Sequence, residues 1–131
     1  MKRTLFIQIL IAVICILRAI GQVVVFVRNP DMLETTPILV LGGTVLIVAL
    51  QVVAAYLAIN RPFMAFLALV AVVGTHAIFF PLGSLISSGT ALSYNFWVGF
   101  MITSLIHIMV ALLAYASWRV ARRANKAGGF L

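Results

Sequence analysis

The sequence predicts an all-α membrane protein: a four-transmembrane-helix, up-down bundle with both termini in the cytoplasm. Three observations support this fold class. Hydrophobic residues make up 65% of the 131 residues and the mean hydropathy is +1.25, far outside the range of soluble globular domains. Four apolar segments are each long enough to cross a bilayer. Lysine and arginine gather beside the segment ends that share one side of the membrane.

The four apolar segments occupy nearly the whole chain, which leaves room for one domain only. A spanning helix needs about 20 mostly apolar residues. The predicted spans cover residues 4–27, 38–59, 62–80 and 92–118, and the fourth is long enough to tilt or to project from the membrane. We therefore interpret residues 1–131 as a single integral membrane domain that ends in a short basic cytoplasmic tail, residues 119–131.

Turn-forming residues mark the connectors. Only Asn60 and Arg61 stand before Pro62, which suits the first position of a helix, so the second and third spans are expected to be antiparallel neighbours. The first connector, residues 28–37, is polar and places a threonine to cap the second span. The third, residues 81–91, mixes glycine and serine with leucine and isoleucine, which predicts a loop in the membrane interface.

The positive charges orient the chain. One side of the predicted spans has only Arg28, offset by Asp31 and Glu34. An excess of lysine and arginine marks the cytoplasmic side. This rule predicts a multi-pass protein of a cell membrane, most simply the bacterial cytoplasmic (inner) membrane. The residues on the positive side are Lys2, Arg3, Arg61, Arg119, Arg122, Arg123 and Lys126.

The first span also has an alternative interpretation as a cleaved signal peptide. Lys2 and Arg3 precede its apolar core, and residues 19–21, Ala-Ile-Gly, resemble a small-residue cleavage site. The apolar run continues to Val27 and three further spans follow, which favours a retained helix. Cys15 is the only cysteine, so no disulfide within the chain is expected.

Arg18 is the most informative residue, because it lies inside the first apolar segment. Arginine at the centre of a spanning helix costs about 3 kcal/mol, whereas each of the sixteen Leu, Ile, Val and Phe residues of this span contributes about 0.4 kcal/mol. The segment is still expected to insert. A charged residue at this depth usually faces the bundle interior or a wet cavity.

The pattern around Arg18 predicts such an inward face. Gln8, Ile11, Cys15, Arg18 and Gln22 recur at intervals of three and four residues, which places them on one stripe of a helix. Similar stripes in the other spans carry polar or small residues that allow close helix approach. They are Thr44, Gln51, Ala55 and Ala58; Ala65, Ala68 and Ala71, with Thr75 and His76 beside them; and Thr103, His107, Val110, Ala114 and Ser117.

Depth along the spans suggests that several of these residues meet. At a rise of 1.5 Å per residue, Arg18 and His76 each lie about 21 Å from the cytoplasmic end of their spans, and His107 lies about 16 Å from its own. We therefore expect a polar cluster in the middle of the membrane. The candidate ligand-binding residues are Arg18, Gln22, Gln51, His76 and His107.

Each of these residues also has a structural interpretation. The N–H groups of Arg18 could be hydrogen-bonded by Gln51, backbone carbonyls and a neutral histidine. In that case Arg18 would only hold the helices together. His76 precedes Phe80 by four residues, which also suits an interfacial histidine on the outer side. His107 also suits a core hydrogen-bond donor to a neighbouring helix.

The function expected from these features is binding or assembly. The guanidinium of Arg18 suits a carboxylate, a phosphate or a quinone-type carbonyl, because it stays charged and donates several hydrogen bonds. We expect a non-catalytic accessory or ligand-binding subunit whose cluster holds an anionic or amphipathic ligand or braces a partner. Its partners are the lipid bilayer and either a larger membrane complex or further copies of itself.

Two alternatives remain. In the first, His76 and His107 are the axial ligands of a b-type haem in an electron-transfer protein, with Arg18 near a propionate. In the second, the chain forms a small oligomeric carrier of anions or lipids. The only acids, Asp31 and Glu34, lie in the outer loop, which disfavours proton-coupled cation export.

Enzyme and nucleic-acid functions are not expected. The sequence has no paired intramembrane carboxylates, no nucleophile triad, no pair of metal-spaced histidines on one helix and no glycine-rich phosphate loop. The basic residues 119–126 are more simply an anchor to anionic lipid than a nucleic-acid surface.

Overall fold

The computed structural model of the protein describes residues 2–89 and 92–128, and these residues are almost entirely helical. Four of the helices are long and apolar enough to cross a membrane. This confirms the prediction of an all-helical chain with four helices of membrane-spanning length. In chain order, the described helices are α1 (Lys2–Arg28), α2 (Asp31–Thr35), α3 (Ile38–Asn60), α4 (Pro62–Ser88) and α5 (Tyr94–Ala127).

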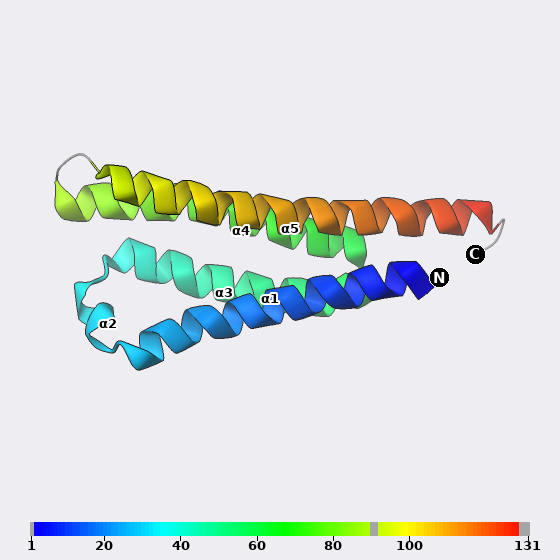
Figure 1. Ribbon diagram of the computed structural model, residues 1–131, viewed down its shortest axis with the longest axis horizontal. Coiled ribbons are helices and arrows are strands. Elements are labelled where there is room, and N and C mark those ends of the chain that lie inside the picture. The colour runs from blue at the N-terminus through cyan, green and yellow to red at the C-terminus, as the bar shows by residue number, and fades with distance from the viewer. Residues whose placement is uncertain (1, 90–91, 129–131) are drawn as a thin grey trace.

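The long helices lie side by side in chain order, and α5 returns to contact α1 (Figure 1). Of these contacts, the one between α3 and α4 is the most extensive and the one between α1 and α5 the least. Figure 1 shows the beginning of α1 and the end of α5 at one end of the molecule and α2 at the other. The interior is therefore tightly closed along α3 and α4 and more open between α1 and α5.

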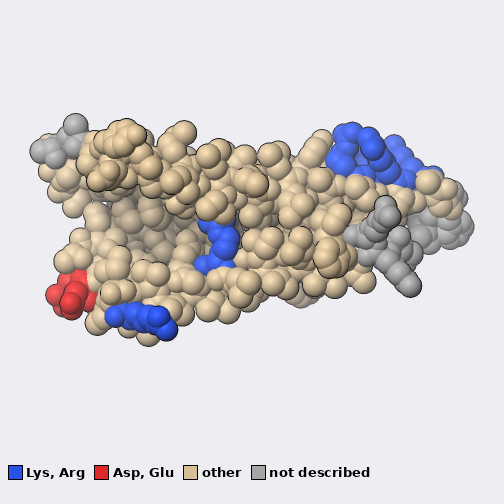
Figure 2. All heavy atoms as spheres, in the orientation of Figure 1, with Lys and Arg blue, Asp and Glu red and all other residues tan. Residues whose placement is uncertain are grey.

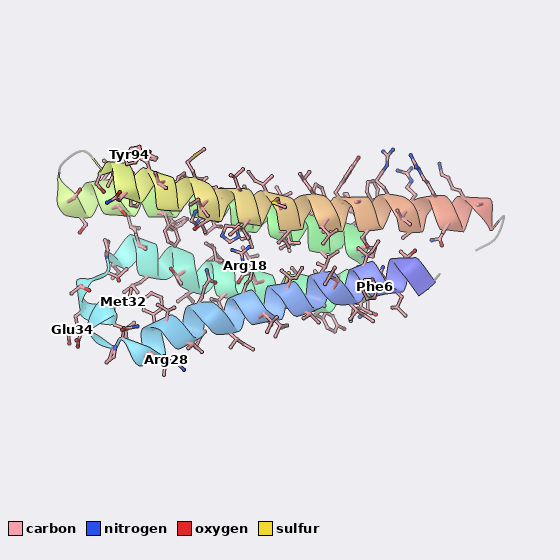
Figure 3. All side chains as sticks on the ribbon, in the orientation of Figure 1. Phe6, Arg18, Arg28, Met32, Glu34 and Tyr94 are labelled. Atoms are coloured by element: carbon pink, nitrogen blue, oxygen red, sulfur yellow. The ribbon has the colours of Figure 1, made fainter. Side chains whose placement is uncertain are left out.

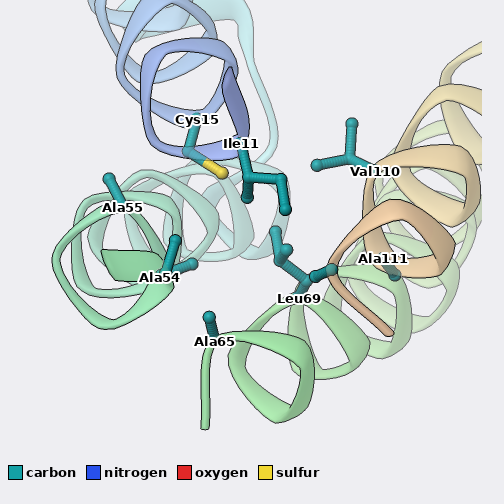
Figure 4. Close-up of a cluster of buried hydrophobic side chains, with 10 residues drawn as sticks. Ile11, Cys15, Ala54, Ala55, Ala65, Leu69, Val110 and Ala111 are labelled. Atoms are coloured by element: carbon teal, nitrogen blue, oxygen red, sulfur yellow. The ribbon is translucent and has the colours of Figure 1, made fainter. Parts of the chain in front are cut away.

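Small side chains fill the centre of the bundle (Figure 4). In a membrane, helices associate largely through van der Waals packing, and small residues let their backbones approach closely. Larger apolar side chains, such as Leu17, Tyr56 and Met109, stay on the exposed outer faces. The buried hydrophobic cluster consists of Ile11, Cys15, Ala54, Ala55, Ala58, Ala65, Leu69, Val110, Ala111 and Ala114.

Two glycines allow α3 and α4 to pack at short range. A Cβ atom added to Gly43 would lie 2.7 Å from the Cβ of Phe79. A Cβ atom added to Gly83 would lie 2.9 Å from Cγ2 of Val40 and 3.2 Å from its backbone nitrogen. Real side chains do not tolerate such separations without movement, so both positions require glycine at this helix spacing.

The predicted inward stripe of α1 agrees with the structure. Ile11 and Cys15 are each 1% exposed, and Gln8, Arg18 and Gln22 are half-buried. The stripes of α3 and α5 also face inward, because their polar and small members are mostly buried. Those buried members are Thr44, Gln51, Ala55 and Ala58 on α3 and His107, Val110, Ala114 and Ser117 on α5.

The expected alanine seam of α4 is only partly correct. Ala65 is fully buried and Ala68 half-buried, but Ala71 is exposed. A spacing of three residues falls short of the 3.6-residue helical turn, so a run of such steps drifts around the helix. Leu69 and Val72 take the buried positions instead.

The boundary predicted at Phe80 is wrong, because α4 continues through Pro81 to Ser88. Proline lacks the N–H that would bond one turn back, but a spanning helix tolerates it when neighbours compensate. Contact with α3 at Gly83 holds this last part of α4 in the bundle. The helix ends at Gly89, whose φ of 63° is left-handed. The interfacial loop expected over residues 81–91 is therefore mostly helix; residues 90 and 91 lie outside the described residues.

The expected basic tail is also helical over most of its length. α5 continues through Trp118 to Ala127. Its 34 residues correspond to about 51 Å, whereas the hydrocarbon core of a bilayer measures about 30 Å. Residues 119–127 thus extend the same rigid helix, and residues 129–131 lie outside the described part of the chain.

The first connector differs from the prediction in two ways. It contains the short helix α2, which carries both acidic residues, Asp31 and Glu34. The predicted threonine cap of α3 is wrong, because Pro37 takes the capping position without a side-chain hydrogen bond. Thr35 instead donates its hydroxyl to the backbone carbonyl of Asp31, 3.1 Å away. The predicted tight turn at Arg61 is correct, with Pro62 in the first turn of α4.

Candidate functional site

Arg18 and His107 meet in the interior of the bundle. Arg18 projects from the inward stripe of α1, beyond Cys15, and its Nη2 atom lies 3.5 Å from Nε2 of His107 on α5. Figure 3 shows Arg18 near the middle of the molecule, between the ribbons of α1 and α5. This separation is at the outer limit of a hydrogen bond. Arginine only donates, so in this contact Nε2 of His107 is the acceptor, the role that it has in the neutral tautomer with its proton on Nδ1.

His76 on α4 joins this pair through its ring. Its centroid lies 4.9 Å from that of His107, with an angle of 59° between the rings. The other neighbours of His76 are aromatic: Phe100 stacks on it at 4.9 Å and Phe80 lies at 4.5 Å. His76 is therefore a residue of the bundle interior, only 3% exposed, rather than a side chain on the outer surface of α4.

The ring nitrogens of His76 make no hydrogen bond of normal geometry within the described residues. Both are buried, and the Phe100 backbone lies nearby. A neutral imidazole has one donor and one acceptor, and a buried polar group without a partner is destabilising by about 1–3 kcal/mol. His76 thus presents unused hydrogen-bonding capacity beside the Arg18–His107 pair.

The two glutamines have similar unpaired atoms at different depths. Gln22 is half-buried on α1, one turn beyond Arg18, and Gln51 on α3 is 1% exposed. The side-chain oxygens of both are buried, with no hydrogen-bond partner in residues 2–89 and 92–128. The structure thus brings Arg18 and His76 each into contact with His107. Gln51 is buried in the same interior but makes no described hydrogen bond to them.

A cavity of about 370 Å³ connects Gln22 with His76. It lies between α1, α4 and the first part of α5, and Figure 2 shows the surface hollowed between α5 and α1. Figure 3 places Arg18 between the same two helices, near the middle of the molecule, although Arg18 itself does not line the cavity. Polar groups and aromatic rings share its wall, a composition typical of sites for small amphipathic molecules. The lining residues are Gln22, His76, Phe80, Asn95, Phe96, Gly99, Phe100 and Thr103.

Apart from Thr103, the α5 side of this cavity was not predicted from the sequence. Asn95, Gly99, Thr103 and His107 recur every four residues, so they lie close to one face of α5. That spacing indicates that Asn95 lies on the same face as Thr103 and His107. It was overlooked because the predicted span began at residue 92, which put Asn95 near the end of the span. Phe96 and Phe100 had no such signal, because isolated aromatic residues occur on every face of an apolar helix.

A second cavity, of about 410 Å³, lies on the other side of Gln22. Its wall is formed by α1, α2 and the first half of α3. Apart from Gln22, the only polar lining residue is Thr44, whose hydroxyl donates to the Val40 carbonyl of its own helix at 2.8 Å. The second cavity is therefore apolar, and Gln22 stands between a polar and an apolar compartment.

The charge of Arg18 has no acidic counterpart. The whole sequence contains two acidic residues, Asp31 and Glu34, and both are on α2 at one end of the molecule. A neutral histidine is therefore the only side-chain partner that the described residues give Arg18. An ionised group in the membrane interior is normally paired with an opposite charge or placed in a wet cavity.

The histidines do not fit a haem as they are placed here. Axial ligation requires the iron and its porphyrin plane to lie between two imidazole nitrogens. The rings of His76 and His107 touch one another instead, and Nε2 of His107 faces Arg18. Among the described residues, no group of three His, Cys, Asp or Glu side chains is placed to hold a metal ion.

The chain was also compared with known proteins. No family model, curated protein sequence or solved structure matches it.

Proposed function

We propose that this protein is a non-catalytic accessory or ligand-binding subunit of the bacterial cytoplasmic membrane that holds an amphipathic ligand beside Arg18. The ligand's head group is anionic or rich in hydrogen-bond acceptors. The observation that carries the proposal is the position of the Arg18–His107 pair beside His76. The ring nitrogens of His76 have no hydrogen-bond partner of normal geometry among the described residues, and His76 lines a cavity of about 370 Å³.

Charge favours a ligand over a purely structural lock. A locked arginine in a bundle core is expected to bond several acceptors, because its guanidinium has five N–H donors. Here one long contact to His107 is the only hydrogen bond that the described residues provide to its side chain. A carboxylate, phosphate or carbonyl oxygen would take the remaining donors and neutralise or disperse the charge.

The two cavities favour an amphipathic ligand over a small inorganic anion. Gln22 lines both, and the compartment on its α3 side is apolar. A head group bound among His76, Thr103 and Arg18 leaves the apolar compartment for an acyl or isoprenoid chain. The opening between α1 and α5, the least extensively packed pair of neighbouring helices, suits entry from the surrounding lipid.

The proposed topology is a four-helix up-down bundle with both termini in the cytoplasm. Basic residues gather at the end of α5, and the acidic residues lie at the opposite end of the molecule (Figure 2). The positive-inside rule assigns the basic end to the cytoplasm. Both cavities are lined by residues near the α2 end, including Leu33 and Asn95, so the ligand is expected to come from the outer leaflet.

The test is to purify the protein in a mild detergent and identify small molecules that remain bound. Native mass spectrometry of the full chain should show an adduct of lipid-like mass, and Arg18→Gln should lose most of it. A charge-assisted hydrogen bond contributes about 1.5–3 kcal/mol, so affinity should fall by about 10- to 150-fold. An absorption spectrum of the same sample checks the haem alternative.

The matched control is Arg28→Gln, which removes an exposed arginine from the same helix outside the cavities. It should keep the adduct. An adduct that persists equally in Arg18→Gln, or its absence from the wild-type protein prepared with added membrane lipid extract, would contradict the proposal.

A further inference from the structure

The last part of α5 presents four positive side chains on one face. Arg119, Arg122, Arg123 and Lys126 are spaced by three, one and three residues, which places them along a single stripe of the helix. All four are exposed, and together they line a depression of about 250 Å³. Figure 2 shows this basic face as a continuous patch at one end of the molecule.

An aromatic cluster marks where this face meets the membrane surface. Phe63 lies 5.0 Å from Trp118 between ring centroids, and Phe66 lies 5.3 Å from Tyr115. Tyr115 and Trp118 also contact each other at 5.6 Å. Tyrosine and tryptophan are enriched at the level of lipid head groups. The cluster thus ties the start of α4 to α5 at the membrane interface.

The distance along α5 places the three arginines in the head-group layer. That layer adds about 5–7 Å on each side of the hydrocarbon core. Arg123 lies five residues beyond Trp118, which corresponds to about 7.5 Å along the helix axis. Arg119 and Arg122 are therefore at head-group depth and Arg123 is at its outer edge, while Lys126, about 12 Å beyond Trp118, lies just outside it.

Aromatic contacts hold two of the arginines over the helix surface. The guanidinium carbon of Arg119 lies 5.8 Å from the centre of the Tyr115 ring, and its Nη1 donates to the Tyr115 hydroxyl at 3.3 Å. The guanidinium carbon of Arg122 lies 5.5 Å from the centre of the Trp118 ring. These contacts restrict the side chains and leave other N–H groups free to bind an anion.

No acidic side chain lies near this face in the part of the chain that the structure describes. The two acidic residues of the chain lie on α2, at the opposite end of the molecule. Guanidinium groups match phosphate oxygens in shape and charge, and phosphates are the anions present at head-group depth. Lysine and arginine near an anionic membrane surface contribute attraction that falls off within a Debye length.

We infer that the basic face of α5, formed by Arg119, Arg122, Arg123 and Lys126, binds the phosphate groups of anionic phospholipids in the adjacent leaflet. This site is separate from the cavity beside Arg18 and uses none of its residues. It fixes the depth of α5 in the membrane and gathers anionic lipid around one end of the bundle.

The test titrates the full chain in detergent micelles with short-chain phosphatidylglycerol, phosphatidylcholine or inorganic phosphate. Binding is followed by the fluorescence of Trp118, measured in a Trp97→Phe background that removes the other tryptophan. Phosphatidylglycerol should bind and phosphatidylcholine should not. Each charge contributes about fivefold in affinity, so Arg122→Gln combined with Arg123→Gln should weaken binding by about 25-fold.

Two sets of control variants distinguish binding at this face from binding elsewhere on the protein. Arg28→Gln, which removes an exposed arginine at the other end of the molecule, should leave phosphatidylglycerol binding at this face unchanged. Replacement of Arg122 and Arg123 by lysine keeps the charge, so most of the affinity should return. Equal binding of phosphatidylcholine, or an unchanged affinity in the double glutamine variant, would overturn the inference. Binding of inorganic phosphate as tight as that of phosphatidylglycerol would also do so, because it would show a site for free phosphate.

Discussion

Arg18 and His107 are 89 residues apart in the sequence, yet Nη2 of the arginine lies 3.5 Å from Nε2 of the histidine. The contact joins α1 to α5, the pair of neighbouring long helices with the least extensive packing. A charged residue thus stands where the bundle is most open, rather than along the tightly packed α3–α4 seam. An arginine that only held the helices together would be expected where they pack closely. Its position at the least extensive contact is more consistent with a site that a ligand can enter.

Replacing Arg18 by leucine should separate these two roles. Leucine removes the charge and improves insertion of the helix by about 3 kcal/mol or slightly more. If the arginine serves a ligand, the purified Arg18→Leu protein should lose the bound adduct while its thermal stability stays close to that of the wild type, because the gain in insertion offsets the lost hydrogen bond to His107. A drop in stability together with a retained adduct would instead favour the structural role.

Replacing His107 should destabilise the protein, because its Nε2 atom is the acceptor for Arg18. His107→Leu leaves the Arg18 guanidinium without its one described partner, and a buried unsatisfied group is destabilising by about 1–3 kcal/mol. The unfolding free energy, measured by denaturant titration in mixed micelles, should fall by that amount. His107→Gln keeps an acceptor and should lose less. Equal losses in the two variants would argue against the Arg18–His107 hydrogen bond.

Glycine substitutions test the close approach of α3 and α4. Gly83→Ala brings a Cβ atom to within 2.9 Å of Val40 and should destabilise the protein by about 1–3 kcal/mol. Gly74, on the same helix, has no atom within 4 Å of an added Cβ. Gly74→Ala should therefore stabilise the helix by up to about 1 kcal/mol. Both values can be measured by unfolding in detergent, and similar effects at the two sites would contradict the packing.

The proposed topology predicts which engineered cysteines are accessible in intact cells. Glu34→Cys on α2 should react with a membrane-impermeant maleimide added outside, and Asn125→Cys near the end of α5 only after the membrane is opened. The native Cys15 is 1% exposed, so it should give little background in the unmodified chain. Labelling of Asn125→Cys in sealed cells would reverse the orientation.

Several features followed from the sequence because they depend on the solvent and on local geometry. A segment of about 20 apolar residues in a bilayer must satisfy its backbone internally, which dictates a helix. The spacing of polar residues on α1 then decides which side faces inward, so Arg18, Cys15 and Gln22 could be placed on one face. The ends of the helices were harder to predict from the sequence. Whether Pro81 ends α4 depends on whether neighbouring helices hold the part of the helix that follows it.

The tertiary structure alone decided which inward residues meet. The depth estimate placed Arg18, His76 and His107 at nearly one level of the membrane, but residues at similar depth on a four-helix bundle can still face different neighbours. Helix order, the unequal closeness of the helix pairs and their rotation bring both Arg18 and His76 to His107, whereas the side-chain oxygen of Gln51 has no hydrogen-bond partner among the described residues. The two cavities on either side of Gln22 exist for the same reason. They depend on how far α1 separates from α3 and α5, which is set by side-chain packing between helices rather than by the pattern along any one of them.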